Sequence, residues 1–303
     1  MWAGVLGYGL GGLLLLVLLW PTESSAVKLL RRWRIAEPTS AQVAEAWSYL
    51  RRRRFWYPWI FLAAPVVFGR FGAPGGDGHG YQQMVVTALA ALLIAELLAL
   101  RPTRARIRTA SLTPRGLFDL VPRWGVTVFA VLIALVVGFA TAGIVAQEWA
   151  FQFWQTLGPD GSVAIYGGSM TVGNPEELGN GSGSWTILGA TGLCLLAVGA
   201  VIGLAMIRPA SGDPVVDAVL RTRSARVALG RGIGLAGPLL NAGVWRIGLL
   251  AQYDHQPTVP PVPGWIPELY RGTGWVPLAA LLGCVLAWIW VANPPAKLPL
   301  VAR

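Results

Sequence analysis

Long apolar stretches alternate with basic segments along most of this chain. The stretches cover about 5–20, 55–69, 84–100, 124–146, 185–207, 232–251 and 275–291. Most of them reach or approach the roughly 20 residues that a helix needs to cross about 30 Å of hydrocarbon. A single segment crosses only as a helix, because a backbone exposed to lipid must satisfy its own N–H and C=O groups. The pattern therefore predicts an all-α fold, a polytopic transmembrane bundle of about seven spans that forms one integral membrane domain over 1–303.

The sixth stretch, 232–251, is the least regular of the seven. It contains five glycines together with Pro238 and Arg246, so a re-entrant or broken segment remains open beside a crossing helix. Small residues also recur at four-residue spacing along the stretches, at Gly7/Gly11, Gly138/Ala142, Gly199/Gly203 and Gly230/Gly234. Such pairs allow close approach of helix backbones in lipid and predict a compact bundle.

Basic residues concentrate in alternate loops. Of the 24 Lys and Arg residues, 21 lie in segments 22–55, 101–123 and 208–231 or at the C-terminus. An excess of Lys and Arg in short loops marks the cytoplasmic side of a membrane. We therefore predict a multi-pass protein of the bacterial plasma membrane with its N-terminus outside, its C-terminus in the cytoplasm, and outer loops at 147–184 and 252–273. Cleavage of the first stretch as a signal peptide is disfavoured, because no basic region precedes it.

Composition narrows the class of protein further. Hydrophobic residues make up 54% of the chain and charged residues only 13%, about half the share of a typical soluble domain. The net charge is +10. The basic residues behind it flank apolar stretches and form no soluble basic domain, so nucleic acid is not an expected partner. A bilayer with an anionic inner leaflet is the expected one.

A short helix is predicted at about 39–50, before the second stretch. Its apolar stripe is followed at once by four consecutive arginines, a pattern typical of a cytoplasmic helix that lies on an anionic leaflet. The stripe consists of Val43, Ala46, Trp47 and Leu50. The candidate contacts with the membrane surface or a partner are Trp47, Arg51, Arg52, Arg53 and Arg54. A docking helix for a cytoplasmic protein, such as an ATPase or a regulator, remains the alternative.

Glu96 and Arg246 are the candidate intramembrane charges. Ionisable residues inside membrane spans are functional candidates by default. By helix rise, Glu96 lies about 6 Å from the inner end of its span and Arg246 about 7 Å from the outer end of its own. Across a core of about 30 Å they would differ in depth by on the order of 15 Å. We therefore expect each side chain to extend to its nearest interface, with a direct pair only if 232–251 is re-entrant.

Recognisable catalytic motifs are absent from the sequence. There is no HExxH and no Walker A motif, Ser169 lacks a GxSxG context, and Cys194 and Cys284 form no CxxC. The neighbours Asp254 and His255 alone are a weak indication of a metal site. We therefore expect no catalytic residue, no metal and no cofactor, and the two cysteines to be small core residues.

Two basic segments carry a resemblance. Residues 100–124 (LRPTRARIRTASLTPRGLFDLVPRW) and 213–226 (DPVVDAVLRTRSAR) resemble loops of uncharacterised multi-pass membrane proteins of high-GC Gram-positive bacteria, a resemblance that implies membrane residence and no activity. The sequence favours a transport-associated protein, the membrane partner of an exporter driven by a separate ATPase. A non-catalytic membrane scaffold or envelope sensor and an intramembrane lipid-modifying enzyme remain open.

Overall fold

The part of the chain that the structure describes covers most of the second half and less of the first. The computed structural model describes residues 20–33, 35–56, 93–98, 116–159, 161–165, 168–171, 182–207, 213–254 and 260–292, with the isolated positions 10, 13, 14, 16–18, 59, 90 and 178. Most of each of the predicted spans 5–20, 55–69 and 84–100 therefore lies outside the described residues.

Helices make up nearly all of the described structure, as the apolar pattern predicts. They are α2 (Glu23–Arg32), α3 (Ser40–Phe55), α6 (Leu117–Leu120), α7 (Arg123–Gln155), α9 (Ser182–Ile207), α10 (Pro214–Ala251), α11 (Trp265–Thr273) and α12 (Val276–Ala292). A small antiparallel hairpin of β1 (Ser162–Ile165) and β2 (Gly168–Thr171) is the exception, and it falls in the predicted loop 147–184. The prediction of a helical bundle is confirmed, with this hairpin as a minor addition.

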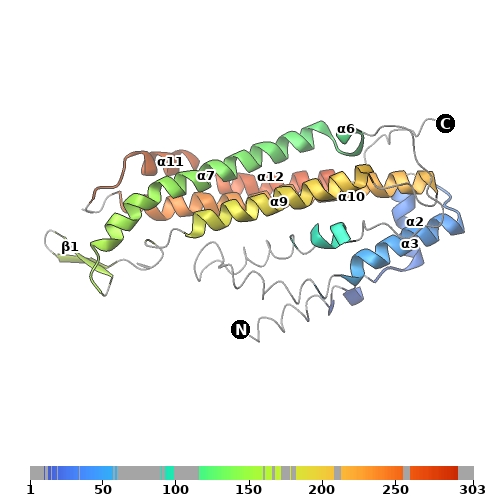
Figure 1. The fold of residues 1–303 in the computed structure, drawn as a ribbon, viewed down its shortest axis with the longest axis horizontal. Helices are drawn as coiled ribbons and strands as arrows, with labels where there is room; N and C mark the ends of the chain where they lie inside the picture. The colour runs from blue at the N-terminus through green and yellow to red at the C-terminus, as the bar shows by residue number, and fades with distance from the viewer. Residues whose placement is uncertain are drawn as a thin grey trace.

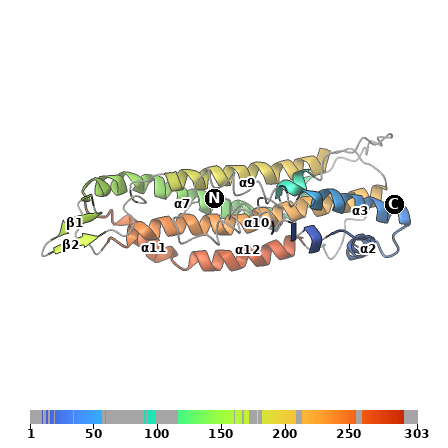
Figure 2. The same ribbon diagram turned by 90° about the horizontal axis from the view of Figure 1, so that it is seen from below.

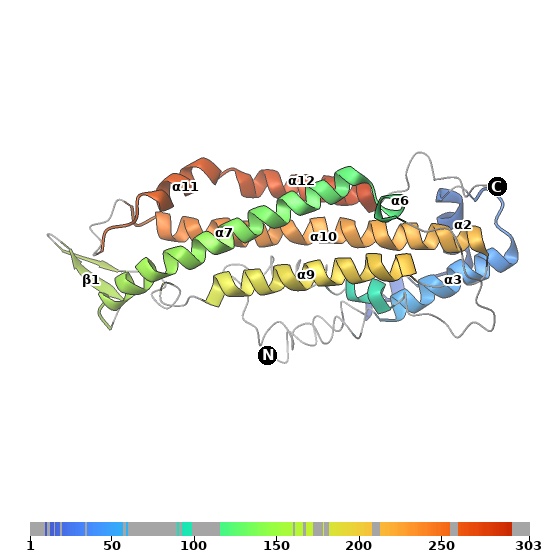
Figure 3. The same ribbon diagram turned by 45° about the horizontal axis from the view of Figure 1, so that its top comes forward.

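The long helices lie side by side along the longest axis of the molecule, and successive ones run in opposite directions (Figure 1). Helix α10 is central, because α7, α9, α11 and α12 all pack against it, and Figure 3 shows it between α9 and the pair α11–α12. Among the described residues, α7, α9 and α10 are long and apolar enough to cross a membrane, and α11 with α12, bent by 43°, forms a possible fourth crossing. Three to four of the seven predicted spans are thus supported, and the count of seven is not.

Helix α10 differs most from its prediction. It is one continuous helix of 38 residues, so a break or re-entrant turn within 232–251 is wrong, and most of the predicted loop 208–231 is helical. The glycines provide close contacts with neighbouring helices and do not interrupt the helix. A Cβ added at Gly230 would lie 2.7 Å from Cδ1 of Trp288, and one at Gly248 would lie 2.6 Å from Cε2 of Tyr270. Neighbouring aromatic side chains therefore occupy the space that larger residues would fill.

The predicted pairs Gly138/Ala142 and Gly199/Gly203 behave differently, and the pair Gly7/Gly11 lies outside the described residues. An added Cβ at Gly138, Gly199 or Gly203 would meet no atom within 4 Å in the described part of the chain. Large apolar side chains on the same helix as two of these glycines are exposed, with Leu193 at 67% and Leu196 at 71%. This surface of α9 suits contact with lipid, and these pairs do not bring described helices together.

Helices α2 and α3 form a unit at one end of the bundle, beside the first half of α10 (Figures 1 and 2). The apolar stripe of α3 packs into a small core with α2 and α10, which contains Ala26, Leu30, Ala46, Tyr49, Leu50, Val216 and Leu220. Trp47 donates a hydrogen bond from Nε1 to the carbonyl of Pro21 at 2.8 Å. Ala46 and Leu50 of the stripe therefore face the protein, whereas Val43 and Trp47 are half-buried, and contact of the helix with the membrane surface stays a prediction. A stripe read from one helix cannot distinguish burial against lipid from burial against other helices.

Asp213 links this unit to the start of α10. Its carboxylate accepts hydrogen bonds from the backbone N–H of Val215 at 2.8 Å and of Val216 at 3.2 Å, which makes it the N-cap of α10. Its other oxygen accepts from Nε2 of Gln42 on α3 at 2.9 Å. The hydrogen bond from Gln42, reinforced by those backbone donors, lowers the pKa of the Asp213 carboxyl below its ordinary value.

Replacement of Asp213 by Ala is expected to lower the free energy of unfolding by about 1 kcal/mol, the usual cost of losing a side-chain N-cap. Because the folded pKa is depressed, the stabilising contribution of Asp213 is present above the unfolded pKa and declines as the pH falls towards the folded one. Denaturant unfolding in detergent at several pH values measures both effects. Asp213→Asn is the matched control, since it retains a capping oxygen but should lose this residue's part of the acid dependence.

Candidate functional site: a carboxylate among arginines

The two candidate intramembrane charges have separate partners. Arg246 donates from Nη2 to Oε1 of Gln147 at 2.7 Å, and Nε2 of Gln147 donates to the carbonyl of Leu178 at 3.0 Å. Glu96 lies on the helical residues 93–98 and is fully buried. The expectation that they do not form a direct pair agrees with these contacts. The expectation that Glu96 extends to an interface does not, because its carboxylate is held inside the protein.

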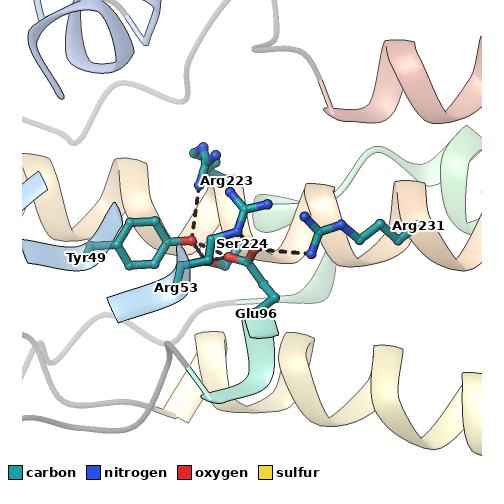
Figure 4. A network of polar contacts seen from close by, with 6 residues as sticks. All are labelled: Tyr49, Arg53, Glu96, Arg223, Ser224 and Arg231. Carbon is teal, nitrogen blue, oxygen red and sulfur yellow. Dashed lines mark hydrogen bonds and ion pairs between the residues drawn. The ribbon is translucent and has the colours of Figure 1, made fainter. Parts of the chain in front are cut away.

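Glu96 accepts from both hydroxyl and guanidinium groups (Figure 4). Its Oε2 lies 2.7 Å from Nε of Arg53 and 3.5 Å from Nη1 of Arg231. Its Oε1 accepts a hydrogen bond from Oγ of Ser224 at 2.8 Å and another from the hydroxyl of Tyr49. Arg223 completes this group, which we call the Glu96 network: Tyr49, Arg53, Glu96, Arg223, Ser224 and Arg231.

The periodicity of two helices brings the network together. Tyr49 and Arg53 are four residues apart on α3, and Ser224 and Arg231 are seven apart on α10, so each pair shares one helix face. Arg223 donates from Nη1 to the hydroxyl oxygen of Tyr49 at 3.1 Å, and its guanidinium lies 5.6 Å from the centre of the Tyr49 ring. The network therefore joins α3, α10 and residues 93–98, which are far apart in sequence.

The surroundings of Glu96 favour an ionised carboxylate. Two arginines and two hydroxyl donors contact it, and both kinds of contact stabilise the charged form. Burial raises the pKa of Tyr49 above its ordinary value and the neighbouring Glu96 carboxylate raises it further, so the phenol remains a donor. Buried ion pairs gain little net stability over apolar packing, yet removal of one partner leaves an uncompensated charge. The network is thus better suited to fixing one arrangement of the three segments than to acid–base chemistry.

The predicted arginine run of α3 divides between surface and interior. Arg51 and Arg52 are exposed and Arg54 is half-buried, whereas Arg53 is only 8% exposed. Only part of the run is therefore available to a membrane surface or a partner. The sequence contains a signal for this division, since Arg53 lies seven residues after Ala46 and four after Tyr49, on the buried face. The roles of Tyr49, Arg223, Ser224 and Arg231 were not predicted.

A pocket of about 320 Å³ adjoins the Glu96 network. Its basic lining residues are Arg32, Arg53, Arg223 and Arg231, and no acidic side chain is among the described lining residues. Its apolar walls are Leu29, Trp33, Val227, Trp288 and Ile289. We call this feature the arginine pocket. It lies between α2, α3, α10 and the last turns of α12.

The remaining candidate groups show no assembled chemistry in the described residues. Asp217 and Arg221 form a buried pair at 2.6 Å within α10, and Asp254 pairs with Arg271 at 3.4 Å. Cys194 and Cys284 are buried free thiols. Among the described positions, no group of three or more His, Cys, Asp or Glu side chains could hold a metal ion. His255 lies outside those positions.

Comparison with known proteins adds no relatives to this picture. No protein family matches the chain, and no curated protein or solved structure is significantly similar to it.

Proposed function

We propose that this protein is a non-catalytic membrane subunit that docks a partner through the end of the bundle formed by α2 and α3. The partner class that we favour is the ATPase of an exporter, which makes the chain transport-associated. The observation that carries the proposal is the attachment of α3 to the central helix α10 through the Glu96 network. A docking site that is rigidly joined to an apolar helix can pass a movement of the partner to the membrane part.

The exposed charges of α2 and α3 support a docking role. The two helices carry five exposed basic residues, which we call the basic platform: Lys28, Arg31, Arg32, Arg51 and Arg52. Positive surfaces attract acidic partners and disfavour the binding of basic ones. The excess of basic residues also favours placement of this end in the cytoplasm, where a soluble ATPase would meet it.

The interior of the bundle supports an accessory role over that of a transporter acting alone. Arg231 and Arg246 are separated by about 22 Å of helix rise on α10. Buried side chains of that stretch are apolar, and they include Ile233, Leu235, Leu239, Leu240, Val244. A hydrophilic substrate path requires several polar lining residues, and between Arg231 and Arg246 this helix offers only the half-buried Asn241. A scaffold that docks a partner other than an ATPase is the second candidate, since it would use the same platform.

Charge reversal on the platform tests this proposal. We expect the variant Arg51→Glu/Arg52→Glu to lose a nucleotide-binding partner that co-purifies with the native protein from its own membranes, because two attractive charges become repulsive. Quantitative mass spectrometry of the purified complexes measures the loss. Arg123→Glu is the matched control, an exposed arginine on α7 outside the platform. If the native protein brings down no nucleotide-binding partner, the export assignment is wrong, and if the variant retains it, the platform is not the docking site.

A further inference from the structure

The arginine pocket lies where the apolar part of α12 ends, beside the Glu96 network. We propose that this pocket binds the phosphate of an anionic phospholipid headgroup. The inference goes beyond docking, because it concerns a small-molecule site whose lining includes α10 and α12 as well as α2 and α3. Its charge, its size and the surface that leads to it point to such a ligand.

The charge of the pocket suits a phosphate. Four arginines line it and Glu96 contacts two of them, Arg53 and Arg231, so positive side chains outnumber negative ones among the described residues of the pocket and the network. Guanidinium groups bind phosphate oxygens in a bidentate manner and are always charged. Arg32 is exposed while Arg53 and Arg231 are buried, which makes a basic path from the surface to the floor.

The size of the pocket suits a headgroup. At about 30 Å³ for each water molecule, a volume of about 320 Å³ corresponds to roughly ten waters. A phosphoglycerol headgroup has on the order of ten non-hydrogen atoms, so it matches this space by the same measure. The volume also falls at the lower end of the range for small-molecule sites.

The exposed apolar surface of α12 favours a lipid over free phosphate as the ligand that carries the phosphate group. Leu278, Leu282, Val285 and Ile289 are all at least 44% exposed. Their spacing of four, three and four residues places them on one face of the helix. Ile289 is also a wall of the pocket, so the apolar face ends at the basic site. The face is about 16 Å long by helix rise, close to half of a hydrocarbon core of about 30 Å. Acyl chains can therefore lie along α12 while the phosphate reaches the arginines.

Lipid competition tests the proposal on the full-length protein in detergent. Native mass spectrometry would compare phosphatidylglycerol with phosphatidylcholine of the same acyl chains. We expect phosphatidylglycerol to bind at least about tenfold more tightly, a difference of about 1.4 kcal/mol. We expect Arg32→Glu to reduce this preference about tenfold, because it places a negative charge at the exposed rim. Arg31→Glu is the matched control, an exposed arginine next in sequence that does not line the pocket.

Four results decide whether the arginine pocket binds an anionic lipid headgroup. Arg32 is exposed, so its replacement should leave the unfolding midpoint of the lipid-free protein unchanged, and that midpoint is measured beside the binding. Equal binding of the two lipids, or a preference that survives Arg32→Glu, overturns the proposal. Inorganic phosphate that competes as tightly as phosphatidylglycerol would show a site for free phosphate and overturn the lipid assignment. The variant Arg51→Glu/Arg52→Glu should keep the preference for phosphatidylglycerol, which would separate the lipid site from partner docking. Loss of the preference in this variant would show that the whole basic surface attracts the lipid, and would overturn the pocket assignment.

Discussion

Replacement of Glu96 by Gln is expected to lower the free energy of unfolding by about 3–5 kcal/mol, the range for breaking a buried ion pair by removing one partner. Arg53 and Arg231 would keep their charges at 8% and 3% exposure without the carboxylate that contacts both. The amide of Gln retains the size of the side chain but offers a neutral oxygen, so the loss reports charge and not a cavity. Denaturant unfolding of the purified protein in detergent, followed by circular dichroism, measures the change.

The control for this substitution is Glu23→Gln, which removes a carboxylate from the exposed first turn of α2. We expect no measurable change in unfolding midpoint for it, because surface charges contribute little. A loss below about 1 kcal/mol for Glu96→Gln would place it in the range of exposed ion pairs. Glu96 would then not be the buried centre of the network.

Replacement of Gly230 by Ala is expected to destabilise the protein by about 1–3 kcal/mol, the cost of an extra methyl group in a packed interior. The new Cβ would lie 2.7 Å from Cδ1 of Trp288 and 3.1 Å from its carbonyl oxygen. The indole ring is rigid and the carbonyl belongs to the backbone, so α10 and α12 would have to separate. Thermal unfolding in the same detergent measures the effect.

Gly199→Ala is the matched control, a glycine of α9 where an added Cβ meets nothing within 4 Å in the described structure. Alanine is a better helix former than glycine by about 1 kcal/mol, so this variant should be neutral or stabilised. Equal destabilisation by the two substitutions would contradict the close contact of Gly230 with Trp288. Stabilisation by Gly230→Ala would contradict it as well.

The sequence predicts the apolar helices better than it predicts their limits. The apolar stretches predict most ends of α7, α9 and α12 to within a few residues. The exception is the end of α7, which continues to Gln155, and the bend between α11 and α12 was not predicted. The continuity of α10 could not be read from composition, because its glycines resemble helix breakers in isolation. Their use becomes visible only when Trp288 and Tyr270 are seen to occupy the space beside them.

The candidate site could be predicted only in part. Glu96 and Arg53 were identified from the sequence as charges in or next to apolar stretches, but their mutual contact was not. Glu96 lies 43 positions after Arg53 and 128 before Ser224, and no local pattern relates residues at such separations. The apolar stripe of α3 was correctly placed on one face. Its burial against α2 and α10 depends on helices that the stripe itself does not specify.

The coupling energy between Glu96 and Arg53 tests most directly whether the network fastens α3 to the bundle. Unfolding of Glu96→Gln, Arg53→Gln and the double variant in one detergent gives the energy that belongs to the pair alone. We predict a coupling of about 1–3 kcal/mol. The double variant should lose less unfolding free energy than the two single variants lose together, because each single substitution leaves the charge or carboxylate of the other partner without this contact. Losses that simply add, with a coupling below about 0.3 kcal/mol, would show that the two side chains do not interact in the folded protein.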